Sequence, residues 1–128
     1  MRPFRKWRLE DQQYKQKIFF CFGGTPEDLL KAMVEEDGGV AEDHGEFSYG
    51  LCVPNRISKA AAPTFWLWIK MFQGKVESYS MLVHETNHLN FHILNWLEIP
   101  QTEDTMEPVA ALQECLFEQI LSCIRGKK

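Results

Sequence analysis

The sequence predicts one α+β domain, in which a short, mostly antiparallel sheet packs against two consecutive helices. Short β-branched and aromatic runs before residue 71 predict the strands, and two long segments with helical patterns of apolar residues after residue 75 predict the helices. The chain has 128 residues and is 45% hydrophobic. That length fits a single domain with a real core, so we expect residues 1–128 to fold as one unit.

The first strand and helix follow from local signals. The apolar run KIFFCF at 17–22 is typical of a buried strand. Thr25 can cap the next helix and Pro26 suits its first position. We expect this helix to run about three turns and to end at the glycine pair 38–39.

Two further strands are expected after a polar loop at 40–46. The run EFSYGLCV at 46–53 has roughly alternating faces, and Pro54 is expected to stop it. The run PTFWLWIK at 63–70 is rich in residues that favour strands. Its leading Pro63 predicts an edge position in the sheet.

The second half of the chain predicts two helices. Residues 76–97 contain no Gly or Pro and carry apolar residues on several faces, which indicates a helix buried nearly all round. Pro100 ends it, and the polar residues 101–105 form a linker. The last helix should run over 106–124. Its apolar stripe consists of Val109, Leu112, Leu116, Ile120 and Cys123. The order β-α-β-β-α-α predicts a sheet covered by helices on one side.

Charge is unevenly distributed along the chain. The net charge is −4, yet residues 1–17 hold six of the 14 Lys and Arg residues. We expect a basic N-terminal arm at 1–16 that can be flexible, with Phe4 and Trp7 packing part of it down. The acidic remainder argues against nucleic acid as a partner.

Cysteine usage indicates a reducing compartment. The four cysteines are Cys21, Cys52, Cys115 and Cys123. They form no CxxC pair and sit among apolar neighbours, which favours reduced thiols in a cytoplasmic protein. The sequence also shows no signal peptide and no apolar run long enough to cross a membrane, so we expect no membrane partner.

Three of the four histidines lie in the stretch VHETNHLNFHILN at 83–95. Residues four apart in a helix project from one face, so His84 and His88 can bind one metal ion together. Glu85 lies beside that face and can take a proton from a water molecule at the metal, as in H-E-x-x-H motifs. The alternative is a pair of core histidines, each of which would need its own hydrogen-bond partner.

A catalytic zinc ion usually has three protein ligands, so a third is expected besides the two histidines. The first candidate is Glu107, at the start of the last helix. It can equally form a capping box with Asp104 that only fixes the helix start. The other candidates for the third ligand are Glu103, Asp104 and Glu114.

His92 is the surplus imidazole of the row. It lies about 12 Å along the helix from His84, which is too far for easy sharing of one ion. We expect it to support the site, to face the substrate or simply to pack. Candidates for stabilising an oxyanion are Tyr49, Tyr79 and His44.

These motifs resemble the zincin metallopeptidases, and among them the gluzincins, which have HExxH on one helix and a Glu on the next. The chain looks most like small single-domain HExxH proteins encoded by tailed bacteriophages and prophages. The resemblance covers roughly residues 45–120 and rests on FWLWIK, VHETNHLNFHIL and DTMEPVAAL. It implies a minimal zincin-like domain with Zn²⁺ held by His84, His88 and Glu107, and with Glu85 as general base.

The expected function is therefore a zinc-dependent metallopeptidase in which Glu85 activates the attacking water. The partner of this enzyme would be a peptide or protein substrate, which can be a host or phage protein. If the protein is phage-encoded, it would act in the host cytoplasm. The rival hypothesis is a non-catalytic, zinc-bound interaction or regulatory protein of phage origin. The small size of the chain and its surplus aromatic residues, Trp66, Trp68 and Trp96, allow that role. The oligomeric state is left open by the sequence.

Overall fold

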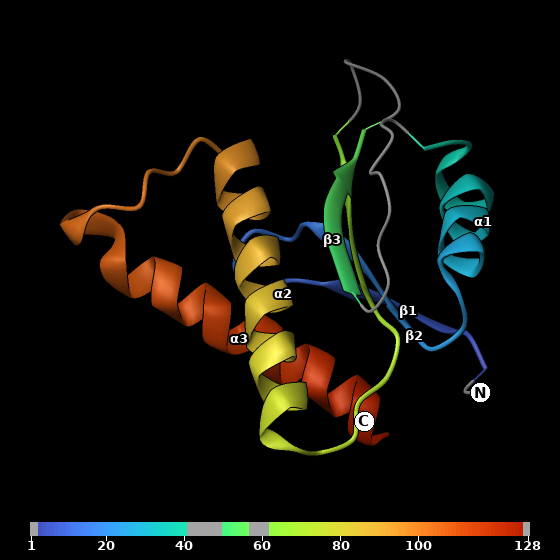
Figure 1. Cartoon of the computed structure of the whole chain (residues 1–128). Helices are drawn as coiled ribbons and strands as arrows, with labels where there is room; N and C mark the ends of the chain where they lie inside the picture. The colour runs from blue at the N-terminus through green and yellow to red at the C-terminus, as the bar shows by residue number, and fades with distance from the viewer. Residues whose placement is uncertain (1–2, 41–49, 57–61, 127–128) are drawn as a thin grey trace.

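The chain forms an α+β fold, as the sequence predicts, in which one four-stranded sheet lies between helices on its two faces (Figure 1). Helix α1 (Pro26–Asp37) covers one face. Helices α2 (Val76–Trp96) and α3 (Met106–Arg125) cover the other. This computed structural model describes residues 3–40, 50–56 and 62–126.

The sheet is mixed, with the strand order β1-β2-β4-β3. Its strands are β1 (Arg5–Glu10), β2 (Lys17–Phe22), β3 (Gly50–Asn55) and β4 (Thr64–Ile69). Strand β2 pairs in parallel with β4, whereas β1 pairs with β2 and β3 with β4 in the antiparallel sense. Two of the three pairings are antiparallel, which confirms the predicted sheet type.

The predicted edge position of the 63–70 strand is wrong, because β4 lies between β2 and β3. Pro63 precedes the first paired residue, so its missing N–H costs the ladder nothing. The strand is buried on both faces, as an interior strand should be. The edge strand next to β4 is β3, which contains Pro54 rather than stopping before it. Residues 46–49 of the predicted strand lie outside the described residues.

Residues 5–10 of the N-terminal arm form strand β1 of the sheet. Residues 5–10 pair with β2 along its whole length. Trp7 stacks on Phe20 with ring centroids 5.3 Å apart, and Phe4 packs near α1, so the predicted packing of both aromatics is confirmed. The basic Lys6 forms an ion pair with Glu36 of α1.

The prediction that helices cover only one face of the sheet is also wrong, because α1 covers the second face. Alternate residues of the inner strands divide between the faces. Ile18 and Phe20 face α2 and α3, whereas Phe19 faces α1. Trp66 and Trp68 are fully buried beneath α1. These two aromatic side chains are therefore not available to a partner.

The helix boundaries follow the sequence closely. Thr25 and Asp28 form a capping box at the start of α1, and Gly38 ends the helix with a positive φ of 84°. The bounds of α2 and α3 agree with the predictions to within one residue. Helix α2 is not buried all round, because a stripe that includes His84 and His88 is exposed.

The turn between β1 and β2 allows a direct test of the fold. Asp11 is fully buried, and its carboxylate accepts hydrogen bonds from the backbone N–H groups of Gln13, Tyr14 and Gln16. We expect Asp11→Ala to lower the free energy of unfolding by about 1–3 kcal/mol, because three backbone N–H groups lose the buried carboxylate that accepts their hydrogen bonds. Urea denaturation measures the change. The neighbouring exposed Glu10→Ala is the control, and an equal effect of both variants would contradict this account.

Candidate metal centre

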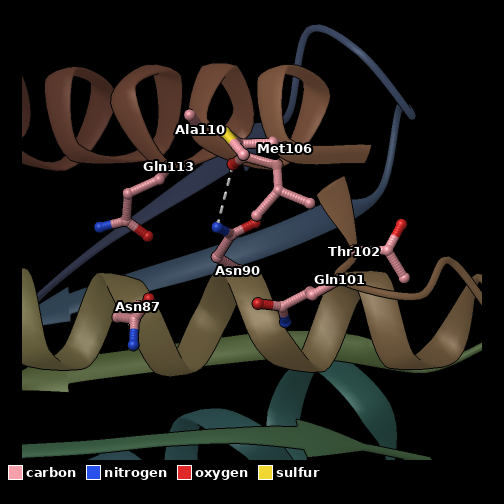
Figure 2. Close-up of a pocket in the computed structure, with 8 residues that line it drawn as sticks. Asn87, Asn90, Gln101, Thr102, Met106, Ala110 and Gln113 are labelled. Carbon is pink, nitrogen blue, oxygen red and sulfur yellow. Dashed lines mark hydrogen bonds between the residues drawn. The ribbon is translucent and has the colours of Figure 1, made fainter. Parts of the chain in front are cut away.

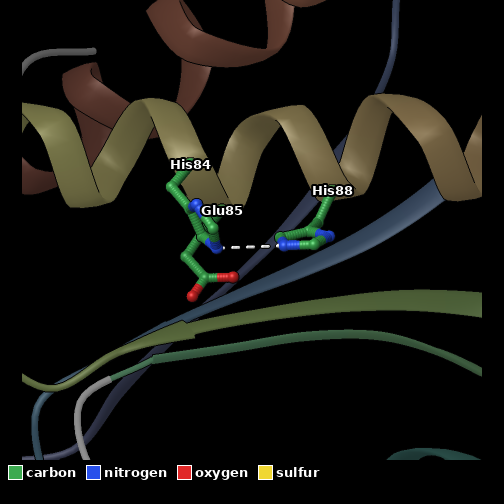
Figure 3. Close-up of side chains that lie close together, drawn as sticks. All are labelled: His84, Glu85 and His88. Atoms are coloured by element: carbon green, nitrogen blue, oxygen red, sulfur yellow. Dashed lines mark hydrogen bonds between the residues drawn. The ribbon is translucent and has the colours of Figure 1, made fainter.

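His84 and His88 project from α2 on the side that turns toward the sheet (Figure 3). His84 and His88 are one helical turn apart, and their Nε2 atoms are 3.0 Å from each other. Their ring centroids are 4.6 Å apart. Both rings are exposed, so solvent and a substrate can reach them. The helix thus brings the two imidazoles together as the four-residue spacing predicts.

This spacing fits two ligands of one metal ion. Two nitrogens that each lie about 2.0–2.1 Å from a zinc ion at a near-tetrahedral angle are roughly 3.3–3.4 Å apart. The distance of 3.0 Å between the two Nε2 atoms is close to this range. Without an ion, the same spacing allows one neutral imidazole to donate a hydrogen bond to the other. The pair is therefore preformed for a cation, and binding would require little movement.

Glu85 completes a cluster of three potential donors. One oxygen of its carboxylate and one nitrogen of each histidine all lie within 4.8 Å of one another. Its side chain is half-buried and points from α2 toward the strands (Figure 3). Burial raises the pKa of this carboxyl, and the nearby His84 and His88 lower it in part. A raised pKa moves a carboxylate toward the range in which a general base works near neutral pH.

Gly50 is a residue of the site that the sequence analysis missed. It lies on the edge strand β3, and a Cβ at this position would be 2.8 Å from a carboxylate oxygen of Glu85. The missing side chain therefore makes room for the Glu85 carboxylate beneath α2. A glycine inside a strand pattern often marks such a close approach, and Gly50 in EFSYGLCV was that signal.

His92 lies next to the cluster without joining it. Its ring centroid is 6.4 Å from that of His88, and it is not part of the cluster of His84, Glu85 and His88. Burial lowers its pKa, while a hydrogen bond with the backbone of Cys52 in β3 acts in the opposite direction. His92 thus ties α2 to the edge strand, which agrees with the predicted supporting or packing role.

Glu107 is not brought to the histidines. It is exposed in the first turn of α3, and the donor cluster among the described residues contains only His84, Glu85 and His88. The other predicted candidates, Glu103, Asp104 and Glu114, are not part of the cluster either.

The reason is the way α3 packs on α2. The side chain of Asn90 donates to the backbone oxygen of Val109, and that of Gln113 donates to Thr86. In a helix of 3.6 residues per turn, Asn90 and His88 point about 160° apart. Helix α3 therefore contacts the side of α2 that is opposite to the two histidines, as Figure 3 also shows.

The capping role predicted for Glu107 is wrong. The reciprocal capping pair at this turn consists of Thr102 and Thr105, in the short 3-10 helix Glu103–Thr105 that precedes α3. The N-cap of α3 is Thr105, whose side chain makes no capping hydrogen bond to that helix.

Of the three predicted oxyanion groups, only Tyr79 lies among the described residues, and its side chain is engaged elsewhere. The hydroxyl of Tyr79 accepts a hydrogen bond of 2.7 Å from Arg125 at the end of α3. Its ring packs edge-on against Phe72. Tyr49 and His44 lie outside the described residues.

Comparisons of the chain with protein-family models, with curated proteins and with solved structures found no match. Within the described part of the chain, no helix combines the length and the apolar character that are needed to cross a membrane. The function is therefore inferred from the geometry of the His84, Glu85 and His88 cluster.

Proposed function

We propose that this protein is a zinc-dependent hydrolase that cleaves peptide bonds. The observation that carries the proposal is the cluster on α2, where the Nε2 atoms of His84 and His88 are 3.0 Å apart beside the Glu85 carboxylate. Two exposed imidazoles next to a half-buried carboxylate are a donor set suited to a catalytic metal with open positions. No cysteine belongs to this set, which argues against a purely structural zinc site.

Each residue of the cluster has a defined task in this proposal. His84 and His88 hold the ion through their Nε2 atoms. When bound, zinc supplies the Lewis acidity that makes a water molecule nucleophilic near neutral pH. Glu85 accepts the proton of the attacking water and passes it to the leaving amine. Gly50 leaves space for the Glu85 carboxylate, and the hydrogen bond of His92 to the Cys52 backbone holds α2 against β3.

A second candidate function is metal binding without turnover, in an interaction or regulatory protein. One observation favours it. Glu85 lies close enough to both histidines to act as the third ligand, and Glu107 does not join them. A carboxylate that binds the ion directly is not free to serve as a base. The burial of Trp66 and Trp68 weighs against this candidate, because it removes two aromatic residues from the surface.

The substrate in our proposal is a peptide or protein in the cytoplasm where this protein acts, and it can be a host or phage protein. The cysteines fit a reducing compartment, since all four are free thiols. Burial raises the pKa of the Cys21 thiol to about 12, so this residue stays protonated and unreactive at neutral pH.

Nucleic acid is not proposed as a partner. In the basic strand β1, Lys6 is paired with Glu36, and the Arg5 guanidinium stacks over Trp7 at 4.5 Å.

Peptide-library cleavage by the zinc-loaded protein tests the proposal. We expect specific products that vanish after chelation and return when zinc is added. Cleavage that persists in the His84→Ala variant would come from a contaminant and would not support the proposal. A complete lack of cleavage by protein that does bind zinc would favour the second candidate.

The role of Glu107 has its own test. Because α3 packs against the opposite side of α2, we expect Glu107→Ala to bind zinc as tightly as the parent. A competitive chelator titration measures the affinity, with Glu103→Ala as a matched control on the same exposed turn. A selective loss of zinc in Glu107→Ala would show that Glu107 is a ligand and that α3 packs differently in the zinc-bound protein.

A further inference from the structure

The second polar feature of the molecule lies between α2 and α3 (Figure 2). Because α3 contacts the side of α2 opposite to His84 and His88, this feature faces away from them. It is a cavity of about 390 Å³, within the size range of small-ligand sites. Met106, Val109 and Ala110 of α3 give it apolar walls. Figure 2 shows Asn90 of α2 and Gln113 of α3 entering the space between the helices from opposite sides.

Two amide oxygens at this cavity have no hydrogen-bond partner. They are Oδ1 of Asn90, a residue only 3% exposed, and Oε1 of Gln113. The amide nitrogens are already used, since that of Asn90 donates to Val109 and that of Gln113 donates to Thr86. The hydroxyl of Thr86 in turn donates to backbone carbonyls of its own helix. The orientation of both amides is therefore fixed, with the acceptors left free.

An unsatisfied buried acceptor is costly, so a group that donates hydrogen bonds and accepts none would be stabilised here. Among the described residues that line the cavity, none is charged. The surrounding chain is strongly acidic, since residues 98–124 contain six Asp and Glu but no Lys, Arg or His. Glu114 and Glu118 line an adjoining apolar hollow that shares Ala110 and Gln113 with the cavity. This charge favours a cationic donor over a neutral one.

We propose that the cavity binds a primary ammonium group carried on a short aliphatic chain. Its N–H groups donate to the free oxygens of Asn90 and Gln113, and its methylene groups lie along Met106, Val109 and Ala110. Ammonium offers three donors and no acceptor, which matches the unmet needs of the site. Such a group can come from a free aliphatic amine or from a lysine side chain of a polypeptide.

The experiment is an NMR titration of the ¹⁵N-labelled protein with n-pentylammonium, observed at the side-chain amides of Asn90 and Gln113. We expect saturable shifts of both signals. The neutral n-pentanol should bind at least about tenfold more weakly, because it lacks the charged donor. Equal binding of the two compounds, or shifts that never saturate, would overturn the proposal.

Variants locate the site. Gln113→Met and Asn90→Leu each remove one free oxygen, and each should weaken n-pentylammonium binding by about tenfold or more. Gln119→Met is the matched control, because Gln119 lies on α3 outside the cavity. His84→Ala should bind like the parent, since the histidines lie across α2. Unchanged affinity in Gln113→Met would contradict the proposal even if Asn90→Leu failed to fold.

A second arm separates the two sources of the ammonium group. Nα-acetyl-lysine-N-methylamide carries the same group on a peptide unit, and Nα-acetyl-norleucine-N-methylamide is its uncharged control. Binding of the lysine compound but not of the norleucine compound supports a polypeptide lysine as the ligand. Binding of n-pentylammonium alone supports a free amine.

Discussion

The Glu85→Gln protein should bind zinc like the parent but should cleave peptide about 10²–10⁴-fold more slowly, which is the typical contribution of a general base. Gln keeps the size and shape of the side chain beside Gly50 and removes only the proton acceptor. Burial raises the pKa of Glu85, which moves its carboxylate toward the range in which a general base works near neutral pH. The measurement is kcat on a substrate from the peptide library, together with zinc affinity by chelator competition.

The same variant separates the two candidate functions. If Glu85 is a ligand rather than a base, Glu85→Gln should lose zinc, because a neutral amide is a poorer ligand than a carboxylate. Glu77→Gln serves as the control, since Glu77 lies in the first turn of α2 and outside the donor cluster. Parental turnover by the zinc-loaded Glu85→Gln protein would contradict the proposed mechanism.

We expect His88→Ala to weaken zinc binding strongly. The loss should exceed the factor of about 10–100 that is typical when only a residue supporting a ligand is removed. The reason is that the 3.0 Å pair of Nε2 atoms then has only one member. His92→Ala is the matched comparison on the same helix, because His92 contacts the Cys52 backbone and is not in the donor cluster. We expect it to lose at most about 10–100-fold. Equal losses in both variants would contradict the assignment of His84 and His88 as the ligand pair.

The sequence predicted the parts of the site that depend on local geometry. The four-residue spacing alone places His84 and His88 together, because any helix through them has that period. The bounds of α2 and α3 were predictable for the same reason, since Gly, Pro and the apolar stripe mark them.

The parts that depend on how elements pack were not predictable. The run TFWLWI is the central strand β4, and its flanking Pro63 misleadingly indicated an edge. The place of Glu107 depends on which side of α2 contacts α3. That side is marked by Thr86 and Asn90, whose polar side chains gave no signal of a helix contact in the sequence. Gly50 was visible as a strand glycine, but its neighbour Glu85 lies 35 positions later in the chain.

The central claim is that one zinc ion binds at the His84 and His88 pair, and X-ray absorption at the zinc edge tests it most directly. The protein is loaded with zinc, dialysed and measured beside the His84→Ala and His88→Ala variants. The account predicts one zinc per chain in the parent, with two imidazole nitrogens and otherwise oxygen ligands at about 2.0–2.2 Å. It also predicts that both variants lose the ion. Sulfur ligands at about 2.3 Å, or zinc retained at full occupancy in both variants, would contradict it.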